Sequence, residues 1–217
     1  MTRTSIALLA LLPLVACRTS EPAPPPPGIS GMLTTDVFHV PAGETVWVDA
    51  DLSISAGTAI VIDGRLVARD AAALGLQDAP HIELVCGLAI DVTGEVLGGR
   101  GADAQHTRGG NGSNVVITAP YTRILGQIVA GSGGEGGRSM PGGRGGDALV
   151  NGVYEGDGEP GHFGLRSGAG GRGGYPGGDG GPGGAAIARV PEGQEVTYEL
   201  RERALATLAR VRGQFPR

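Results

Sequence analysis

The stretch VIDGRLVA, at residues 61–68, indicates the fold because its pattern returns twice further along the chain. DVTGEVLG follows at 91–98 and RILGQIVA at 123–130. An apolar residue stands two positions before and two positions after the central glycine of each stretch, a spacing that puts both side chains on one face of a strand. The central glycines are spaced 30 and 32 residues apart and are Gly64, Gly94 and Gly126.

Apolar residues also alternate with polar ones between and before these repeats, which predicts further strands with one buried face. The residues expected to point inward are Val46, Val48, Leu52, Ile54, Ile60, Ile62, Ile82, Leu84, Val115 and Ile117. Short strands at a fixed period near 30 residues predict an all-β fold, a short β-solenoid of the β-helix type with coils stacked about 4.8 Å apart. A β-sandwich of hairpins also uses short strands and is the alternative.

Three glycine-rich insertions interrupt the predicted solenoid, at 98–114, 130–147 and 168–184. Each contains two x-Gly-Gly runs joined by a short turn, as in GAGGRGGYPGGDGGPGG at 168–184. A polyproline II helix has three residues per turn, so every x side chain falls on one edge and the bare edges can hydrogen-bond to neighbouring helices. Valine in place of Gly143, Gly171 or Gly180 is therefore expected to wedge such helices apart.

These runs resemble the polyglycine II bundles of certain phage tail-tip adhesins and of an insect-like antifreeze protein. The resemblance implies three ordered, polyglycine-II-like arms that project from the solenoid. Disordered glycine loops, which low-complexity composition usually indicates, are the alternative.

The first 16 residues have the features of a signal peptide, a positive start followed by a short apolar run. LVAC at 14–17 resembles a bacterial lipobox, which implies a lipid on Cys17, a palmitoylated membrane anchor. Arg18 stands where Asp commonly retains a lipoprotein at the inner membrane, so the resemblance implies an outer-membrane lipoprotein, at the periplasmic face or the cell surface. The Pro-rich segment 17–28 is expected to be an extended tether, followed by the solenoid at 29–190.

The C-terminal segment 191–217 has helical spacing of apolar residues. The solenoid's end would otherwise expose strand edges and core, so this strand and helix are predicted to cap it. A helix that docks onto a partner is the alternative interpretation.

The chain carries a formal net charge of −5, and all 17 basic residues are arginine. This balance argues against a nucleic-acid partner, and three scattered Arg-Gly-Gly sequences do not change that expectation. Cys86 alternates with apolar residues and is expected to be a small buried side chain without a disulfide.

GGRGGDALV at 142–150 matches a calcium-binding nonapeptide pattern, and GGRGADAQH at 98–106 matches it in part. Asp103 and Asp147 are therefore weak calcium candidates. The two copies are not in tandem, and a hard cation needs six or more oxygen ligands, so no metal site and no cofactor are predicted. The structural alternative is that Asp147 caps an arm.

The segment 151–167 breaks the x-Gly-Gly pattern and gathers aromatic and charged residues, which is typical of a recognition loop. It is equally consistent with a minor core beneath the arms. With the aromatic residue of the third insertion, the candidate ligand-binding residues are Tyr154, Glu155, Asp157, Glu159, His162, Phe163, Arg166 and Tyr175.

The expected function is non-enzymatic: a lipid-anchored cell-envelope protein that is structural, adhesive or ligand-presenting. Its expected partners are the membrane, through the lipid, and a surface glycan or an envelope protein. A small carbohydrate-active or calcium-dependent glycan-binding β-helix protein is the alternative. No nucleophile–base pair is evident in the sequence, and the solenoid is short for a substrate groove.

Overall fold

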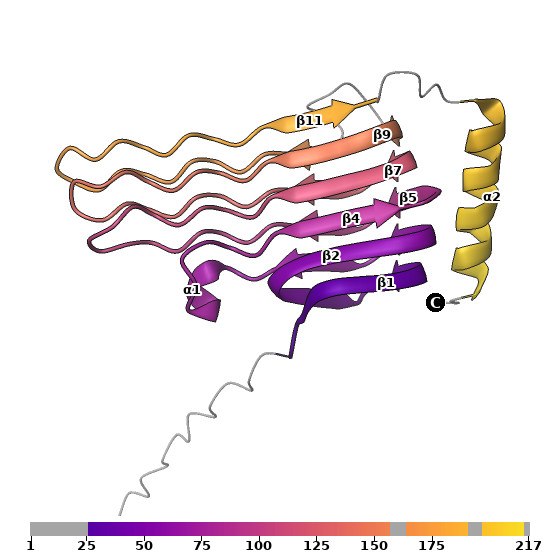
Figure 1. Cartoon of the computed structure of the whole chain (residues 1–217), viewed down its shortest axis with the longest axis horizontal. Helices are drawn as coiled ribbons and strands as arrows, with labels where there is room; N and C mark the ends of the chain where they lie inside the picture. The colour runs from indigo at the N-terminus through magenta and orange to yellow at the C-terminus, as the bar shows by residue number, and fades with distance from the viewer. Residues whose placement is uncertain (1–25, 157–163, 191–196, 215–217) are drawn as a thin grey trace, which may run out of the picture.

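The structure, a computed structural model, describes residues 26–156, 164–190 and 197–214. In the described part of the chain, strands account for 41% of the residues and helices for 12%, which confirms the predicted predominance of strands and the C-terminal helix (Figure 1). The strands are β1 (Ile29–Val40), β2 (Thr45–Ile62), β3 (Arg65–Ala68), β4 (Ile82–Cys86), β5 (Ala89–Val92), β6 (Glu95–Leu97), β7 (Val115–Ile124), β8 (Gln127–Val129), β9 (Ala148–Gly156), β10 (Leu165–Arg166) and β11 (Ala186–Arg189). The helices are α1 (Ala71–Leu74) and α2 (Tyr198–Gln214).

All the strand pairs run parallel, and most join segments about one sequence repeat apart. Ile62 pairs with Val92, and Val92 pairs with Ile124, as the aligned repeats predict. Strands β2, β4, β7 and β5 close into a ring of four parallel strands. The outer strands extend this ring: β1 lies on β2, β9 and β11 follow β7, and β3, β6, β8 and β10 form a row.

The core lies between these strands and consists almost entirely of aliphatic side chains. All but one of the residues predicted to point inward are buried, and Val46 is partly buried against the same cluster. Cys86 is buried as expected, and burial raises the pKa of its thiol. A raised pKa keeps the thiol protonated at neutral pH, so this cysteine is a packing residue.

The central glycines of the repeats stack directly on one another at a bend of the chain. A methyl group on Gly94 would overlap the carbonyl oxygen of Gly64, and one on Gly126 would overlap that of Gly94. In both places the overlapped atom belongs to backbone, which cannot move aside without breaking the strand pairing. Glycine is therefore required here by the close approach of two layers.

Helix α2 stands along the side of the stack, against β2, β5 and β7 (Figure 1). Ala204, Leu208 and Val211 form its buried face, and Tyr121 lies opposite them on β7. The prediction that this helix caps the end of the stack is therefore wrong. The side of the stack is apolar at this point because small residues such as Ala59 and Ala89 face outward, and the helix covers them.

A cluster of charged side chains joins α2 to two successive layers. Arg212 Nη1 lies 2.5 Å from Asp91 Oδ2, and Arg212 Nη2 lies 2.7 Å from Asp63 Oδ1. Arg123 donates two further hydrogen bonds to Asp91, at 2.9 and 2.6 Å. His39 Nε2 lies 3.2 Å from Asp63 Oδ2. Because the Asp91 side chain is fully buried, its charge depends on both arginines.

We expect the stability that α2 contributes to fall in acid. Burial opposes ionisation of Asp63, but hydrogen bonds from Arg212, Thr93 and His39 outweigh it and lower the pKa of this carboxyl from 3.8 to about 2. The folding stability that ionised Asp63 contributes is present above pH 3.8 and is lost as the pH falls towards 2. Chemical denaturation should show a loss of about 2 kcal/mol across this range. Arg212→Met should reduce that loss, whereas Arg210→Met, on the exposed face of the same helix, should retain it.

Candidate functional site

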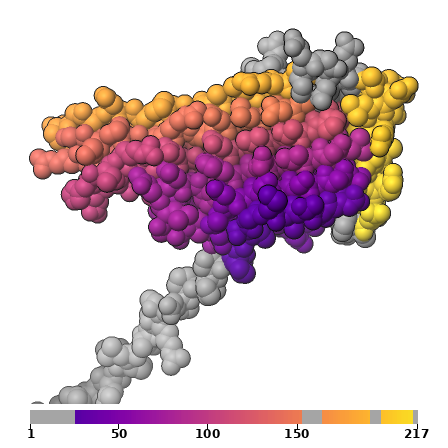
Figure 2. All heavy atoms as spheres, viewed as in Figure 1, coloured from indigo at the N-terminus to yellow at the C-terminus, as the bar shows by residue number. Residues whose placement is uncertain are grey.

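The three glycine-rich insertions are ordered projections that leave the strands and return to them (Figures 1 and 2). We refer to 98–114, 130–147 and 168–184 as arms 1, 2 and 3. Each has an outgoing line, a turn at its far end, and a return line. The turns of the three arms lie together at the end of the molecule opposite α2.

Backbone hydrogen bonds join each arm to the next, and the donors recur every third residue. On the outgoing lines the N–H of Gly133 donates to Ala169 O at 2.8 Å, and that of Gly136 donates to Arg172 O at 2.8 Å. The return lines repeat the arrangement, with Gly142 donating to Asp179 O and Gly145 to Pro182 O, both at 2.9 Å. Diagonal bonds link opposite lines of successive arms: Gly134 to Gly110 O and Gly171 to Gly143 O, both at 2.8 Å.

These contacts need bare backbone. A methyl group on Gly143 would overlap the carbonyl oxygen of Gly110, and one on Gly171 would overlap that of Gly134. Gly180 differs from the expectation, because the nearest atom to a methyl group there would be Gly171 O at 3.7 Å. A side chain at Gly180 would therefore push no helices apart within a single chain, since this glycine lies on the outer side of arm 3.

The two calcium candidates bind the next layer of the chain instead of facing each other. Asp103 Oδ1 accepts the N–H of Glu135 at 2.7 Å, and this bond, together with Arg100, lowers the pKa of the carboxyl despite some burial. Asp147 Oδ1 accepts the N–H of Ala185 at 2.8 Å. Among the described residues, no group of three or more His, Cys, Asp or Glu is placed to hold a metal ion. These carboxylates act as side-chain caps between layers.

The turns of the arms come together as a tip, which we define as residues 105–108, 138–141 and 175–178. Backbone and side-chain contacts hold the three turns together: Gly174 N–H donates to Met140 O at 3.0 Å, and Ser139 Oγ donates to Pro176 O at 2.6 Å. Arg138 N–H donates to Gln105 O at 3.2 Å. The tip is therefore a fixed surface built from three separate parts of the sequence.

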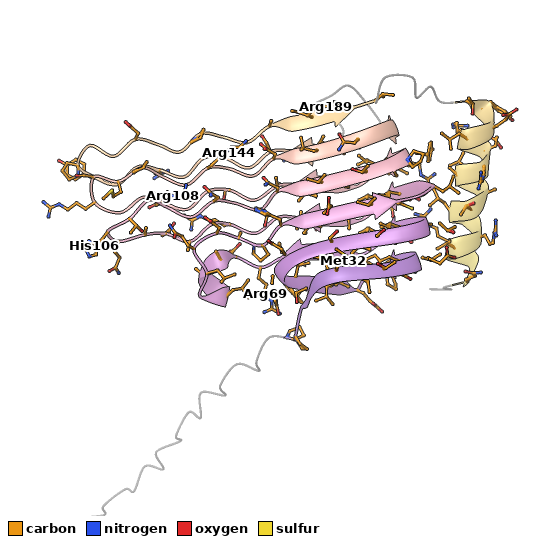
Figure 3. The ribbon with its side chains drawn as sticks, in the orientation of Figure 1. Met32, Arg69, His106, Arg108, Arg144 and Arg189 are labelled. Atoms are coloured by element: carbon orange, nitrogen blue, oxygen red, sulfur yellow. The ribbon has the colours of Figure 1, made fainter. Side chains whose placement is uncertain are left out.

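The tip is basic and aromatic, although the chain as a whole is acidic. It contains two arginines and one histidine and no Asp or Glu, whereas the whole chain has a net charge of −5. Tyr175 is 93% exposed, and Arg138 is exposed as well. His106 and Arg108 are also exposed (Figure 3). An exposed aromatic ring beside cations is suited to a sugar ring that carries a negative charge.

The structure separates the residues that sequence analysis grouped as a binding site. Tyr175 lies at the tip, whereas the exposed Arg166 in β10 lies at the opposite end of the outgoing line. Tyr154 and Glu155 belong to β9, where they pair with Thr122 and Arg123 of β7. The remaining candidates lie outside the described residues and are Asp157, Glu159, His162 and Phe163. His106, Arg108 and Arg138 were not among the binding residues predicted from the sequence. The signal that could have indicated them was their place between two x-Gly-Gly runs.

A groove of about 450 Å³ lies on the face formed by β1, β2, β4 and β7. Met32, 82% exposed, lies at its side (Figure 3). The polar atoms around it are already used between layers: His81 N–H donates to Asp51 Oδ1 at 2.8 Å, and Asn114 N–H donates to His81 Nδ1 at 2.9 Å.

Comparison of the chain with protein-family models, with curated proteins and with solved structures finds no match. In the described part of the chain, neither helix has the length and apolar character that a membrane span requires.

The close packing of the arms can be tested by substitution of a single glycine. Gly143→Val should lower the free energy of unfolding by about 1–3 kcal/mol, because the side chain would push apart backbones that hydrogen-bond to each other. Arg144→Val changes the adjacent exposed residue and should cost less than about 1 kcal/mol. Amide exchange should show protection at Gly133, Gly143 and Gly171. Rapid exchange at all three would contradict the packed arrangement.

Proposed function

We propose that the protein is a non-enzymatic, lipid-anchored envelope protein that presents the arm tip to an acidic glycan. In this proposal the body is a short β-solenoid and the arms form a small polyglycine II bundle. Parallel pairing of segments roughly one repeat apart supports the solenoid. The three-residue period of the inter-arm hydrogen bonds supports the bundle.

The observation that carries the proposal is the rigid display of a basic, aromatic tip. Its three turns are fixed to each other by hydrogen bonds, and the lines behind them are fixed by backbone bonds along their length. A preformed surface binds a ligand without the entropic cost of ordering loops. Tyr175 offers a ring face for stacking, and Arg138 and Arg108 offer charged donors for a carboxylate.

Anchoring at the N-terminus agrees with how the chain enters the body. Gly28 N–H donates to Asp49 Oδ2 at 2.8 Å, and Arg69 Nε lies 2.6 Å from Asp49 Oδ1. Arg69 also donates to the carbonyl of Pro26 and lies 5.0 Å from the Trp47 ring centroid. This clamp holds Pro26 and Gly28 against the layer formed by β1 and β2, which supports a tether that leaves the body at this layer.

Binding by the tip can be tested with an oligosaccharide of uronic acids and with its carboxyl-reduced, neutral counterpart. The acidic form should bind more tightly, and added salt should weaken it. Tyr175→Ala and Arg138→Ala should each weaken binding about tenfold. Arg189→Ala is the matched control, because Arg189 is exposed on β11 and far from the tip (Figure 3). Equal binding of both sugars, or an equal effect of the control, would refute recognition by the tip.

Anchoring can be tested separately through the two cysteines of the chain. Cys17→Ala should move the protein from the membrane fraction to the soluble fraction and abolish incorporation of labelled palmitate. Cys86→Ala is the control, because this buried side chain has no route to the lipid. A Cys17→Ala variant that stays with the membrane would exclude lipid anchoring while leaving the function of the tip open to its own test.

A further inference from the structure

Arm 3 has an outer edge at which the hydrogen-bonding pattern of the arms stops. In arm 2, the glycine that follows each x residue donates its N–H to arm 3. The equivalent glycines of arm 3 donate to no other described residue, and they are Gly170, Gly173, Gly180 and Gly183. The carbonyls of Gly181 and Gly184 correspond to those of Gly143 and Gly146, which accept from arm 3, yet they accept from no described residue. This edge therefore offers both donors and acceptors.

Two glycines on this edge are not explained by packing within one chain. Methyl groups on Gly142 and Gly145, in arm 2, would overlap the backbone of arm 3. On the equivalent Gly180 and Gly183 they would come no closer than 3.7 Å to any atom. Glycine carries an entropic cost on folding relative to alanine. The x-Gly-Gly pattern thus continues as if a fourth layer lay on arm 3.

We propose that this fourth layer is arm 3 of a second copy of the chain. The opposite side of the arms is closed, because the segment around α1 covers arm 1: Ala71 N–H donates to Arg100 O at 2.9 Å and Ala79 N–H donates to Asn111 O at 3.0 Å. Arm 3 is then the open side of the stack, and the projecting part of it forms the upper margin of the molecule in Figure 2. Two copies that each have one open edge meet edge to edge about a two-fold axis.

The edge is complementary to itself in hydrogen bonding. A two-fold axis along the arms places the outgoing line of one copy over the return line of the other. The N–H groups of Gly170 and Gly173 then face the carbonyls of Gly181 and Gly178 of the second copy, because these carbonyls lie opposite them within arm 3. Such pairing of oppositely directed lines already exists inside the chain, where Gly171 N–H donates to Gly143 O. The new contact therefore shares with the existing arms the pairing of oppositely directed lines. It differs in its donors, because Gly133 and Gly136, the equivalents of Gly170 and Gly173 in arm 2, donate to a line of the same direction.

The charged x residues of arm 3 agree with the same axis. Arg172 lies on the outgoing line and Asp179 on the return line, on either side of the turn at 175–178. The axis that exchanges the two lines brings Arg172 of each copy to the side of Asp179 of the other. Both side chains are exposed in the single chain, and neither has an ion pair to another described residue. Opposite charges across the edge favour this pairing over one in which the outgoing lines of the two copies face each other.

The experiment measures the molar mass of the full-length chain in detergent by sedimentation over a range of concentrations, without any glycan. A concentration-dependent dimer is expected. Gly180→Val with Gly183→Val should raise its dissociation constant about tenfold or more while leaving the melting temperature of the monomer unchanged, since both sites are open in one copy. Ala169→Val, on an exposed x position of the same arm, is the control of matched chemistry.

A charge exchange gives a second, independent measurement. Arg172→Glu alone should weaken the dimer, and Arg172→Glu with Asp179→Arg should restore it. Amide exchange at Gly170, Gly173, Gly180 and Gly183 should slow as the concentration rises. A monomer at every concentration, or a dimer indifferent to both sets of variants, would overturn the proposal. If the chain stays monomeric but binds an added x-Gly-Gly peptide, the edge binds a different glycine-rich partner. That result would also overturn the proposed dimer.

Discussion

The structure depends on one constraint: backbones of successive layers must approach to hydrogen-bonding distance along the whole length of each layer. In the body this is achieved by parallel strands, whose side chains point above and below the line of hydrogen bonds. In the arms the chain has three residues per repeat, and one side chain in three is the most that the contact tolerates. Body and arms thus achieve the same close approach of backbones in two ways. The chain changes from one to the other where the sequence changes from alternating apolar residues to x-Gly-Gly.

Side chains at the borders of the layers complete this arrangement. Equivalent places in successive layers are occupied by Asp51, His81, Asn114 and Asp147. The side chain of each of the first three accepts the backbone N–H of the next residue named, and the side chain of Asp147 accepts the N–H of Ala185. These caps satisfy donors at the point where strand becomes arm, which is where the regular pairing changes. The same requirement explains why Asp103 and Asp147, the carboxylates of the nonapeptide-like sequences, accept backbone N–H groups of the next layer.

The repeat of apolar residues around Gly64, Gly94 and Gly126 was sufficient to predict the predominance of strands, their stacking partners and most of the core, because these follow from short-range alternation at a fixed period. The position of α2 was not predictable in the same way. Its apolar face is evident in the sequence, but the surface that receives it is formed by Ala59, Ala89 and Tyr121, which come together only after three layers stack. The tip escaped prediction for a similar reason, since its residues belong to three turns separated by more than 30 residues each.

The edge of arm 3 also bears on how the proposed anchor and the proposed binding tip are arranged relative to each other. The clamp around Arg69 and Asp49 lies in the first layers of the stack, while arm 3 lies in the last. In the proposed pair, the two-fold axis runs through the arm 3 edges, so the two tether exits lie at opposite poles of the assembly. The same axis runs along the arms, so the two tips lie side by side and double the basic surface. Short tethers at opposite poles favour a pair that joins two facing membranes over one within a single membrane, because in the latter one tether would have to span the height of both stacks.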